Sequence, residues 1–176
     1  MAFALNTARL RLRELTPADA PYLLRQLNEP SFIENIADRG VRTLAQAEAY
    51  LETGPIISYR QHGFGFWAVA DKDTEAVLGL CGLVKRDALP EPDLGYAFLP
   101  EYVGQGYAFE ACRASLRAAR DIFHLPALLA IVNEGNTASR RLLEKLGFGF
   151  QGMTALAPDG PELCLYRIEL TEHTAC

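Results

Sequence analysis

The pattern of apolar and polar positions in the first third of the chain predicts one strand followed by helices. Residues 9–15 alternate with period two, which is typical of a strand with one buried face. Thr16 and Pro17 then resemble a helix start, because an acid follows three residues after Thr16. A second start lies at Thr43, with Gln46 as its capping partner. We therefore expect helices over residues 16–28, 43–54 and 56–60.

From residue 65 onward, short apolar runs alternate with helical patterns. Apolar runs of strand length predict strands over residues 66–70, 76–84, 94–99, 127–132 and 163–170, and one around Met153. Helices are expected over 106–123 and 137–146, the second with Asn136 as N-cap and Gly147 after its end. One face of the first helix should be buried, through Ala108, Ala111, Cys112, Ser115, Ala119 and Ile122. This order predicts a mixed α/β fold in one domain, residues 1–176.

Composition supports a single soluble domain and excludes several function classes. The 176 residues are 49% hydrophobic and 22% charged, and no apolar run approaches the roughly 20 residues of a membrane span. The N-terminus has no signal-peptide pattern, so we expect a cytoplasmic protein without a membrane partner. Cysteines at 81, 112, 164 and 176 form no CxxC pair, and the three histidines have no ligand spacing, so no metal is expected. The net charge of −5 argues against nucleic acid.

Two glycine-rich segments invite comparison with phosphate-binding loops. Residues 147–152 fit GxGxxG, but a helix precedes them and a strand follows, the reverse of the dinucleotide-binding order. Residues 104–108 instead follow a strand and open a long helix, where backbone N–H groups and the helix dipole favour an anion. On spacing alone, a tight turn explains this second segment equally well.

Three ordered stretches resemble the GNAT superfamily of N-acetyltransferases. Asp93–Ala111 resembles its central motif and Asn133–Phe148 its second motif. The opening stretches Thr7–Arg13 and Thr16–Asp19 resemble the start of the RimJ/RimL-type branch, whose members act on ribosomal-protein alanine or serine. The resemblance therefore covers nearly the whole chain.

The resemblance implies a fold, a donor substrate and a donor site. The implied fold is α/β (α+β), with a central twisted, mostly antiparallel sheet, splayed central strands and helices on both faces. Acetyl-CoA is the implied donor, bound by a core of about residues 93–148, in direct transfer to an amine without a covalent enzyme intermediate. The strand would hold the pantetheine arm, the loop the pyrophosphate, and the second motif the pantetheine end. The implied cofactor-binding residues are Ala97, Phe98, Leu99, Val103, Gly104, Gln105, Gly106, Tyr107, Ala108 and Asn136.

Catalytic roles are less clearly marked. Many family members use a tyrosine on the second-motif helix as the acid for the leaving thiol, but Leu143 stands there in this sequence. Ser139 lies on the same inward helix face and is our candidate replacement, with close helix packing as the alternative explanation. Asp93 resembles a catalytic glutamate position and is our candidate base, with a solvent-facing strand end as the alternative. A backbone N–H near Phe98 is the expected oxyanion donor.

The resemblance also implies that the acceptor is a primary amine, on a protein N-terminus or on a small amine or polyamine. Residues of about 16–62 are expected to form the acceptor side, and the charge of −5 weakly favours a cationic amine. Acidic side chains that could line its pocket are Glu34, Asp38, Asp93 and Glu101. The competing hypothesis is a non-catalytic acyl-CoA-binding regulatory domain, supported only by the missing tyrosine. RimJ/RimL-like proteins are often dimers, so a homodimer is an expectation by resemblance.

Overall fold

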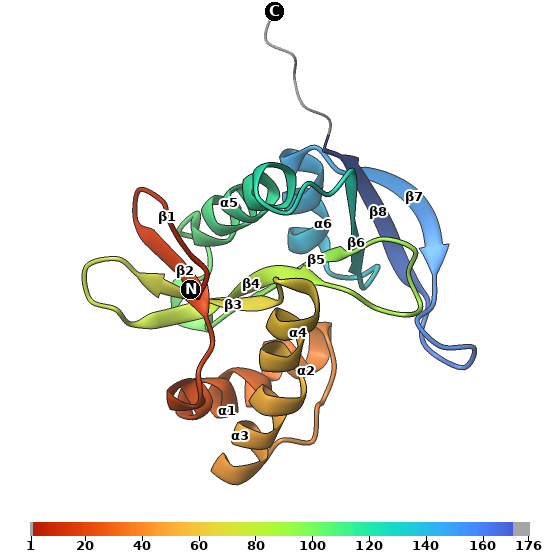
Figure 1. Ribbon diagram of the computed structural model, residues 1–176. Coiled ribbons are helices and arrows are strands. Elements are labelled where there is room, and N and C mark those ends of the chain that lie inside the picture. The colour runs from red at the N-terminus through yellow and green to blue at the C-terminus, as the bar shows by residue number, and fades with distance from the viewer. Residues whose placement is uncertain (1, 171–176) are drawn as a thin grey trace, which may run out of the picture.

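An eight-stranded sheet forms the centre of the protein (Figure 1). The computed structural model describes residues 2–170. The strand order is β1-β2-β3-β4-β5-β6-β8-β7, and every neighbouring pair is antiparallel except β5 and β6. This confirms the mostly antiparallel sheet. The strands are β1 (Ala4–Asn6), β2 (Leu10–Glu14), β3 (Phe66–Asp71), β4 (Val77–Val84), β5 (Asp93–Phe98), β6 (Ala127–Val132), β7 (Gly149–Thr154) and β8 (Leu163–Glu169).

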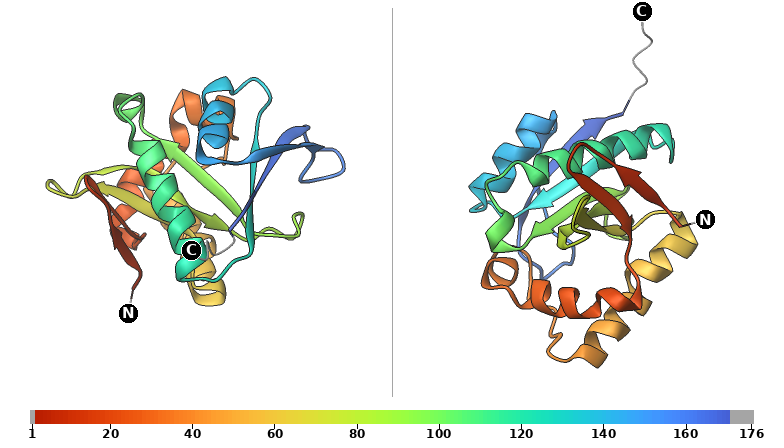
Figure 2. Two further views of the ribbon diagram at one scale, coloured as in Figure 1. Left: turned by 90° about the horizontal axis from the view of Figure 1, so that it is seen from above. Right: turned by 90° about the vertical axis from the view of Figure 1, so that its left-hand side faces the viewer.

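Helices cover both faces of the sheet, as Figures 1 and 2 show. One face carries α1 (Ala20–Asn28), α2 (Pro30–Asn35), α3 (Leu44–Thr53) and α4 (Pro55–His62), and the other carries α5 (Tyr107–Asp121) and α6 (Thr137–Leu146). Short 3-10 turns, η1 (Pro17–Asp19) and η2 (Pro100–Tyr102), precede α1 and the loop before α5.

Period-two alternation in the central strands supplies both layers of the core. Trp67 and Val69 of β3 pack toward α5, whereas Ala68 between them packs among residues of α1 and α3. Strands buried on both faces read as continuous apolar runs, which is why β3 and β4 were recognisable in the sequence.

The helix boundaries follow the capping signals. Thr43 Oγ1 accepts a hydrogen bond from Gln46 N at 3.2 Å, and Gln46 Oε1 accepts one from Thr43 N at 3.1 Å, so the expected capping box is formed. Gly147 ends α6 in the left-handed conformation at φ +102, which confirms that this glycine is a helix stop.

Three features differ from the sequence-based expectations. The strand β1 and the short helix α2 were not anticipated, because each covers fewer than two periods of its pattern. The expected burial of Ile122 is wrong: Ile122 is the C-cap residue of α5 and is 49% exposed. Two residues considered above, His173 and Cys176, lie outside the described part of the chain.

The sheet opens between β5 and β6. These two parallel strands are in register only at Asp93 and Leu129, where Leu129 N donates to Pro92 O at 3.0 Å. By contrast, β5 pairs with β4 along its whole length. The backbone of β5 beyond Asp93 therefore lacks a strand partner on the β6 side, which confirms the expected splay.

Candidate active site

A cleft of about 760 Å³ occupies the opening between β5 and β6. Its walls include both splayed strands, the loop before α5 and the first turns of α5 and α6. Ten of the twelve sequence-predicted site residues line it: Asp93, Ala97, Phe98, Val103, Gly104, Gly106, Tyr107, Ala108, Asn136 and Ser139.

The other two predicted residues, Leu99 and Gln105, turn away from the cleft. Leu99 is buried, its N–H donates to Leu78 O at 3.0 Å, and its carbonyl accepts from Tyr102 N at 3.0 Å. The Gln105 side chain donates to Glu101 O at 2.8 Å. Leu99 thus fixes the end of β5, and only the backbone N–H of Gln105 is free to face a ligand.

The loop before α5 presents a row of free backbone donors. Gly104 and Gly106 adopt φ +80 and +82, a left-handed conformation that other residues adopt only at a cost. Among the described residues, no protein acceptor receives a hydrogen bond from the N–H groups of residues 104–109; the next N–H, of Glu110, bonds Gly106 O. Six consecutive unpaired donors at the positive end of a 15-residue helix favour an anion.

Glu110 holds this loop against the N-terminal strands. Its carboxylate accepts from Thr7 Oγ1 at 2.6 Å, from Arg9 N at 2.9 Å and from Arg9 Nε at 2.7 Å. Burial alone would raise the pKa of Glu110, but these hydrogen bonds hold it below its ordinary value. The Arg9 guanidinium also donates to Gln105 O at 3.0 Å. Glu110 therefore shapes the loop rather than contacting a substrate.

The start of α6 brings two predicted side chains to the cleft. Asn136 Oδ1 accepts from Ser139 N at 3.3 Å, which is the N-cap interaction expected for an asparagine at this position. Among the described residues its Nδ2 has no hydrogen-bond partner, so the amide can cap the helix and still donate into the cleft.

A tyrosine that the sequence analysis missed meets Ser139 across the opening. Tyr96 Oη of β5 lies 2.5 Å from Ser139 Oγ. Burial raises the pKa of Tyr96, so its hydroxyl stays protonated at neutral pH. Leu143, where related enzymes carry their tyrosine, is buried in the core. The only available signal was the alternation in β5, which places Tyr96 on the same face as Leu94 and Phe98.

Asp93 is buried at the point where the strands part. Its residue is 1% exposed, and its Oδ1 accepts a hydrogen bond from Arg86 Nε at 3.0 Å. Burial raises the pKa of Asp93, although the charge and hydrogen bond of Arg86 oppose that effect. A solvent-facing carboxylate, the alternative considered for Asp93, is therefore wrong.

Hydrogen-bond alternation in β5 also directs free backbone groups into the opening. Leu99 N–H points to β4, where it donates to Leu78 O. Because successive N–H groups along a strand point to opposite sides, the N–H groups of Phe98 and Tyr96 point toward β6. At these positions β6 no longer pairs with β5, so both donors face the cleft.

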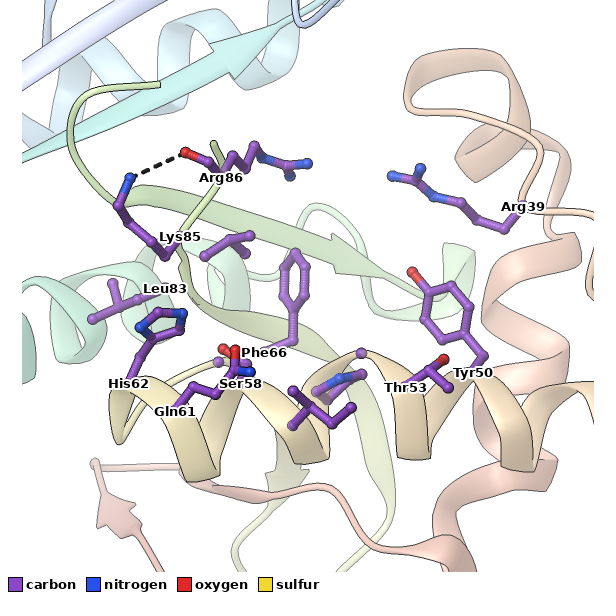
Figure 3. A pocket seen from close by; sticks show the side chains of 15 residues that line it. Arg39, Tyr50, Thr53, Ser58, Gln61, His62, Phe66, Leu83, Lys85 and Arg86 are labelled. Carbon is purple, nitrogen blue, oxygen red and sulfur yellow. Dashed lines mark hydrogen bonds between the residues drawn. The ribbon is translucent and has the colours of Figure 1, made fainter. Parts of the chain in front are cut away.

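A second hollow, of about 330 Å³, adjoins the cleft on the side of α3 and α4 (Figure 3). The two share four larger side chains, Arg39, Tyr50, Phe66 and Arg86, and also Pro55. The acids considered for an acceptor pocket do not gather here. Asp38 pairs with Arg42 at 2.6 Å and Glu101 pairs with Arg25 at 2.8 Å, and neither lines the hollow; nor does Glu34.

We also searched the part of the chain that the structure describes for metal-binding groups and for membrane-spanning helices. Residues 2–170 contain no group of three His, Cys, Asp or Glu side chains arranged for a metal. Within the same range, no helix is long and apolar enough to cross a membrane. Arg113 and Arg117 are exposed on α5, on a face that solvent covers.

Comparison with known proteins agrees with this geometry. Residues 9–149 match the model of the acetyltransferase (GNAT) domain. The chain belongs to the GNAT family of acetyltransferases. Because the match spans most of the chain, it includes the cleft, the loop before α5 and α6, and it identifies the protein as an enzyme of the N-acetyltransferase class.

Individual relatives extend over nearly the whole length of the GNAT chain. The uncharacterized protein YkkB of Bacillus subtilis is 30% identical, covering 83% of this chain and 85% of its own. An acetyltransferase structure from Agrobacterium tumefaciens is 27% identical with a TM-score of 0.78, covering 95% and 94%. RimL, a ribosomal L7/L12 alpha-N-protein acetyltransferase solved in complex with coenzyme A, shares the fold at TM-score 0.82 and 13% identity, covering 95% and 98%.

Proposed function

We propose that this protein is an acetyl-CoA-dependent N-acetyltransferase that moves the acetyl group directly to a primary amine, on a protein N-terminus or on a small amine. The observation that carries the proposal is the row of unpaired N–H groups at residues 104–109, next to the open edge of β5. A pyrophosphate and an extended, amide-bearing arm are the two chemical features that such neighbouring surfaces fit. RimL, with the same fold, was solved with coenzyme A.

In this proposal the donor site is divided among three elements. The loop Val103–Ala108 holds the pyrophosphate through the backbone N–H groups of residues 104–108, including that of Gln105. The pantetheine arm lies along the free edge of β5, past Ala97, where its amides meet the backbone groups of Tyr96 and Phe98 that face the cleft, and Asn136 Nδ2 contacts the end of that arm. Each of these groups lacks a protein partner on the side facing the cleft, which is what a ligand-binding backbone requires.

The proposed reaction uses the side chains at the splay. Asp93, through a chain of water molecules, accepts the proton that the amine loses as its nitrogen bonds to the thioester carbonyl carbon. The N–H of Phe98 stabilises the negative oxygen of the tetrahedral intermediate. When the carbon–sulfur bond breaks, the Ser139 hydroxyl, hydrogen-bonded to Tyr96, donates a hydrogen bond to the leaving thiolate, which then takes its proton from water. The pair of hydroxyls thus takes the place of the tyrosine missing at Leu143.

A thiol-release assay tests this function against the regulatory alternative. The protein is incubated with acetyl-CoA and a panel of N-terminal peptides and small amines, while acetyl-CoA binding is measured separately by calorimetry. We expect free thiol above the no-acceptor background for at least one class of amine. Acetyl-CoA binding without turnover on any acceptor would instead support a regulatory acyl-CoA-binding domain.

A further inference from the structure

The hollow beside the cleft is positively charged in a protein that is negatively charged overall. Three cationic side chains line it, together with His62, and no Asp or Glu is among its described lining residues. The whole chain carries a formal net charge of −5, so this local excess is opposite in sign to the average surface. The three cations are Arg39, Lys85 and Arg86.

The charges of these groups are largely uncompensated. Among the described residues, Arg39 has no hydrogen bond or ion pair. Lys85 Nζ donates hydrogen bonds only to the carbonyl oxygens of Arg86 and Leu89, at 3.1 and 3.0 Å, and its charge also acts on the nearby Asp93 carboxylate without an ion pair. Arg86 uses its Nε for Asp93 and leaves both terminal nitrogens without a partner. In Figure 3, the guanidinium groups of Arg39 and Arg86 point toward one another across the hollow.

This positive region lies next to the reacting centre. Arg86 lines both the hollow and the cleft, and it bonds Asp93, the carboxylate placed at the splay. Gln26 of α1 adds a second unpaired polar group to the cleft wall. Its residue is 1% exposed and its Oε1 accepts from Tyr22 Oη at 2.8 Å, while its amide nitrogen has no partner among the described residues. Buried polar groups are normally paired, so this amide is available to a ligand.

From these observations we infer that the acceptor carries a carboxylate close to its amine, and that Arg39 and Arg86 bind that carboxylate. This inference rests on the proposed acetyl transfer and narrows its acceptor class. Two guanidinium groups facing one another match the bidentate geometry of a carboxylate. A polyamine would place further positive charge against Arg39, Lys85 and Arg86, and the one acid among the described lining residues of hollow and cleft, Asp93, is already bonded to Arg86. The carboxylate is supplied either by an acidic side chain near a peptide N-terminus or by the α-carboxylate of a free amino acid.

Matched acceptors test the inference. The first set comprises the peptide amides Ala-Glu-Trp, Ala-Gln-Trp and Ala-Lys-Trp, which share one amine and differ in charge. The second set compares alanine with alaninamide. Binding of each to the protein saturated with coenzyme A is measured by calorimetry, and turnover with acetyl-CoA by thiol release. The variants are Arg39→Gln and, as a matched control, Arg60→Gln on α4, an exposed arginine that lines neither hollow nor cleft.

We expect one carboxylate-bearing acceptor to bind about tenfold more tightly than its neutral partner, the effect of one charge-assisted hydrogen bond. A preference within the peptide set indicates an acidic side chain as the source of the carboxylate, and a preference for alanine over alaninamide indicates the α-carboxylate of a free amino acid. Arg39→Gln should remove the preference and leave coenzyme A affinity unchanged, and Arg60→Gln should keep both. Equal binding of charged and neutral acceptors, or tighter binding of Ala-Lys-Trp amide, would overturn the inference. If the neutral acceptors are nevertheless acetylated, the inference about the carboxylate fails but the proposed acetyl transfer is supported.

Discussion

Replacing Gly106 by alanine should weaken coenzyme A binding because it strains the loop that presents the free N–H groups. Gly106 has φ +82, and a residue with a Cβ pays about 1–2 kcal/mol in the left-handed region. The new Cβ would lie 3.3 Å from Arg9 Nη2, the end of a flexible side chain, so steric overlap adds little. If this whole free energy opposes the loop conformation that binds the anion, coenzyme A affinity drops by about 5- to 30-fold.

The assay is calorimetric titration of coenzyme A into the wild-type protein and two variants. Gly152→Ala is the matched control, because Gly152 also has a positive φ, of +123, and open space around it, but lies outside the cleft. Both substitutions should lower the melting temperature by a few degrees, at about 2–4 °C for each kcal/mol. Only Gly106→Ala should lower coenzyme A affinity.

Acetyl-pantetheine, which lacks the pyrophosphate, separates loop strain from general damage. Gly106→Ala should use it as well as the wild type does, because the affected N–H groups contact only the pyrophosphate in the proposed complex. If Gly106→Ala binds coenzyme A within twofold of wild type despite a lower melting temperature, the pyrophosphate is not held by residues 104–109 and the donor site is assigned wrongly.

Three further predictions concern the side chains at the splay and in the core. Ser139→Ala and Tyr96→Phe should each lower kcat with little change in coenzyme A affinity. Because the two hydroxyls act as one pair, kcat of the double variant should fall by less than the product of the two single reductions. An unchanged kcat would show that both side chains serve only in packing. Because burial raises the pKa of Asp93, the wild-type rate should fall as the pH drops through that raised pKa and the carboxylate is protonated. Asp93→Asn should be slow and should show no such fall in rate at low pH. If Asp93→Asn shows the same fall as the wild type, Asp93 is not the base. Cys81 and Cys112, whose sulfurs lie 3.8 Å apart, should react slowly with iodoacetamide in the folded protein. Both thiols are buried, and burial raises the pKa of Cys112. Rapid alkylation of either cysteine in the folded protein would contradict this prediction.

Local signals in the sequence account for most of the fold. The capping pair Thr43–Gln46, the stop at Gly147 and the alternation in residues 9–15 each act over a few residues, so their structural consequence is readable without tertiary information. The strand-to-helix position of the segment containing Gly106 was recognisable for the same reason. The segment α2 was missed because its six residues, which begin with Pro30, cover fewer than two helical turns and so carry too little periodicity.

The remaining site features depend on contacts between segments far apart in the chain. The Tyr96–Ser139 hydrogen bond joins residues 43 positions apart, and no local pattern reports it. Arg39 and Arg86 come from loops on different sides of the hollow, and only the sheet topology brings them together (Figure 3). Net charge averages over the whole surface, so it says nothing of how charges gather at one site.

The most direct test of the account is a crystal structure of the protein with acetyl-CoA bound. The account predicts that the pyrophosphate accepts hydrogen bonds from the N–H groups of residues 104–109, and that the pantetheine arm lies along the free edge of β5. The thioester carbonyl should lie near Phe98 N and its sulfur near Ser139 Oγ. A pyrophosphate bound elsewhere, or a thioester remote from both Phe98 and Ser139, would contradict the donor site and the chemistry assigned to it.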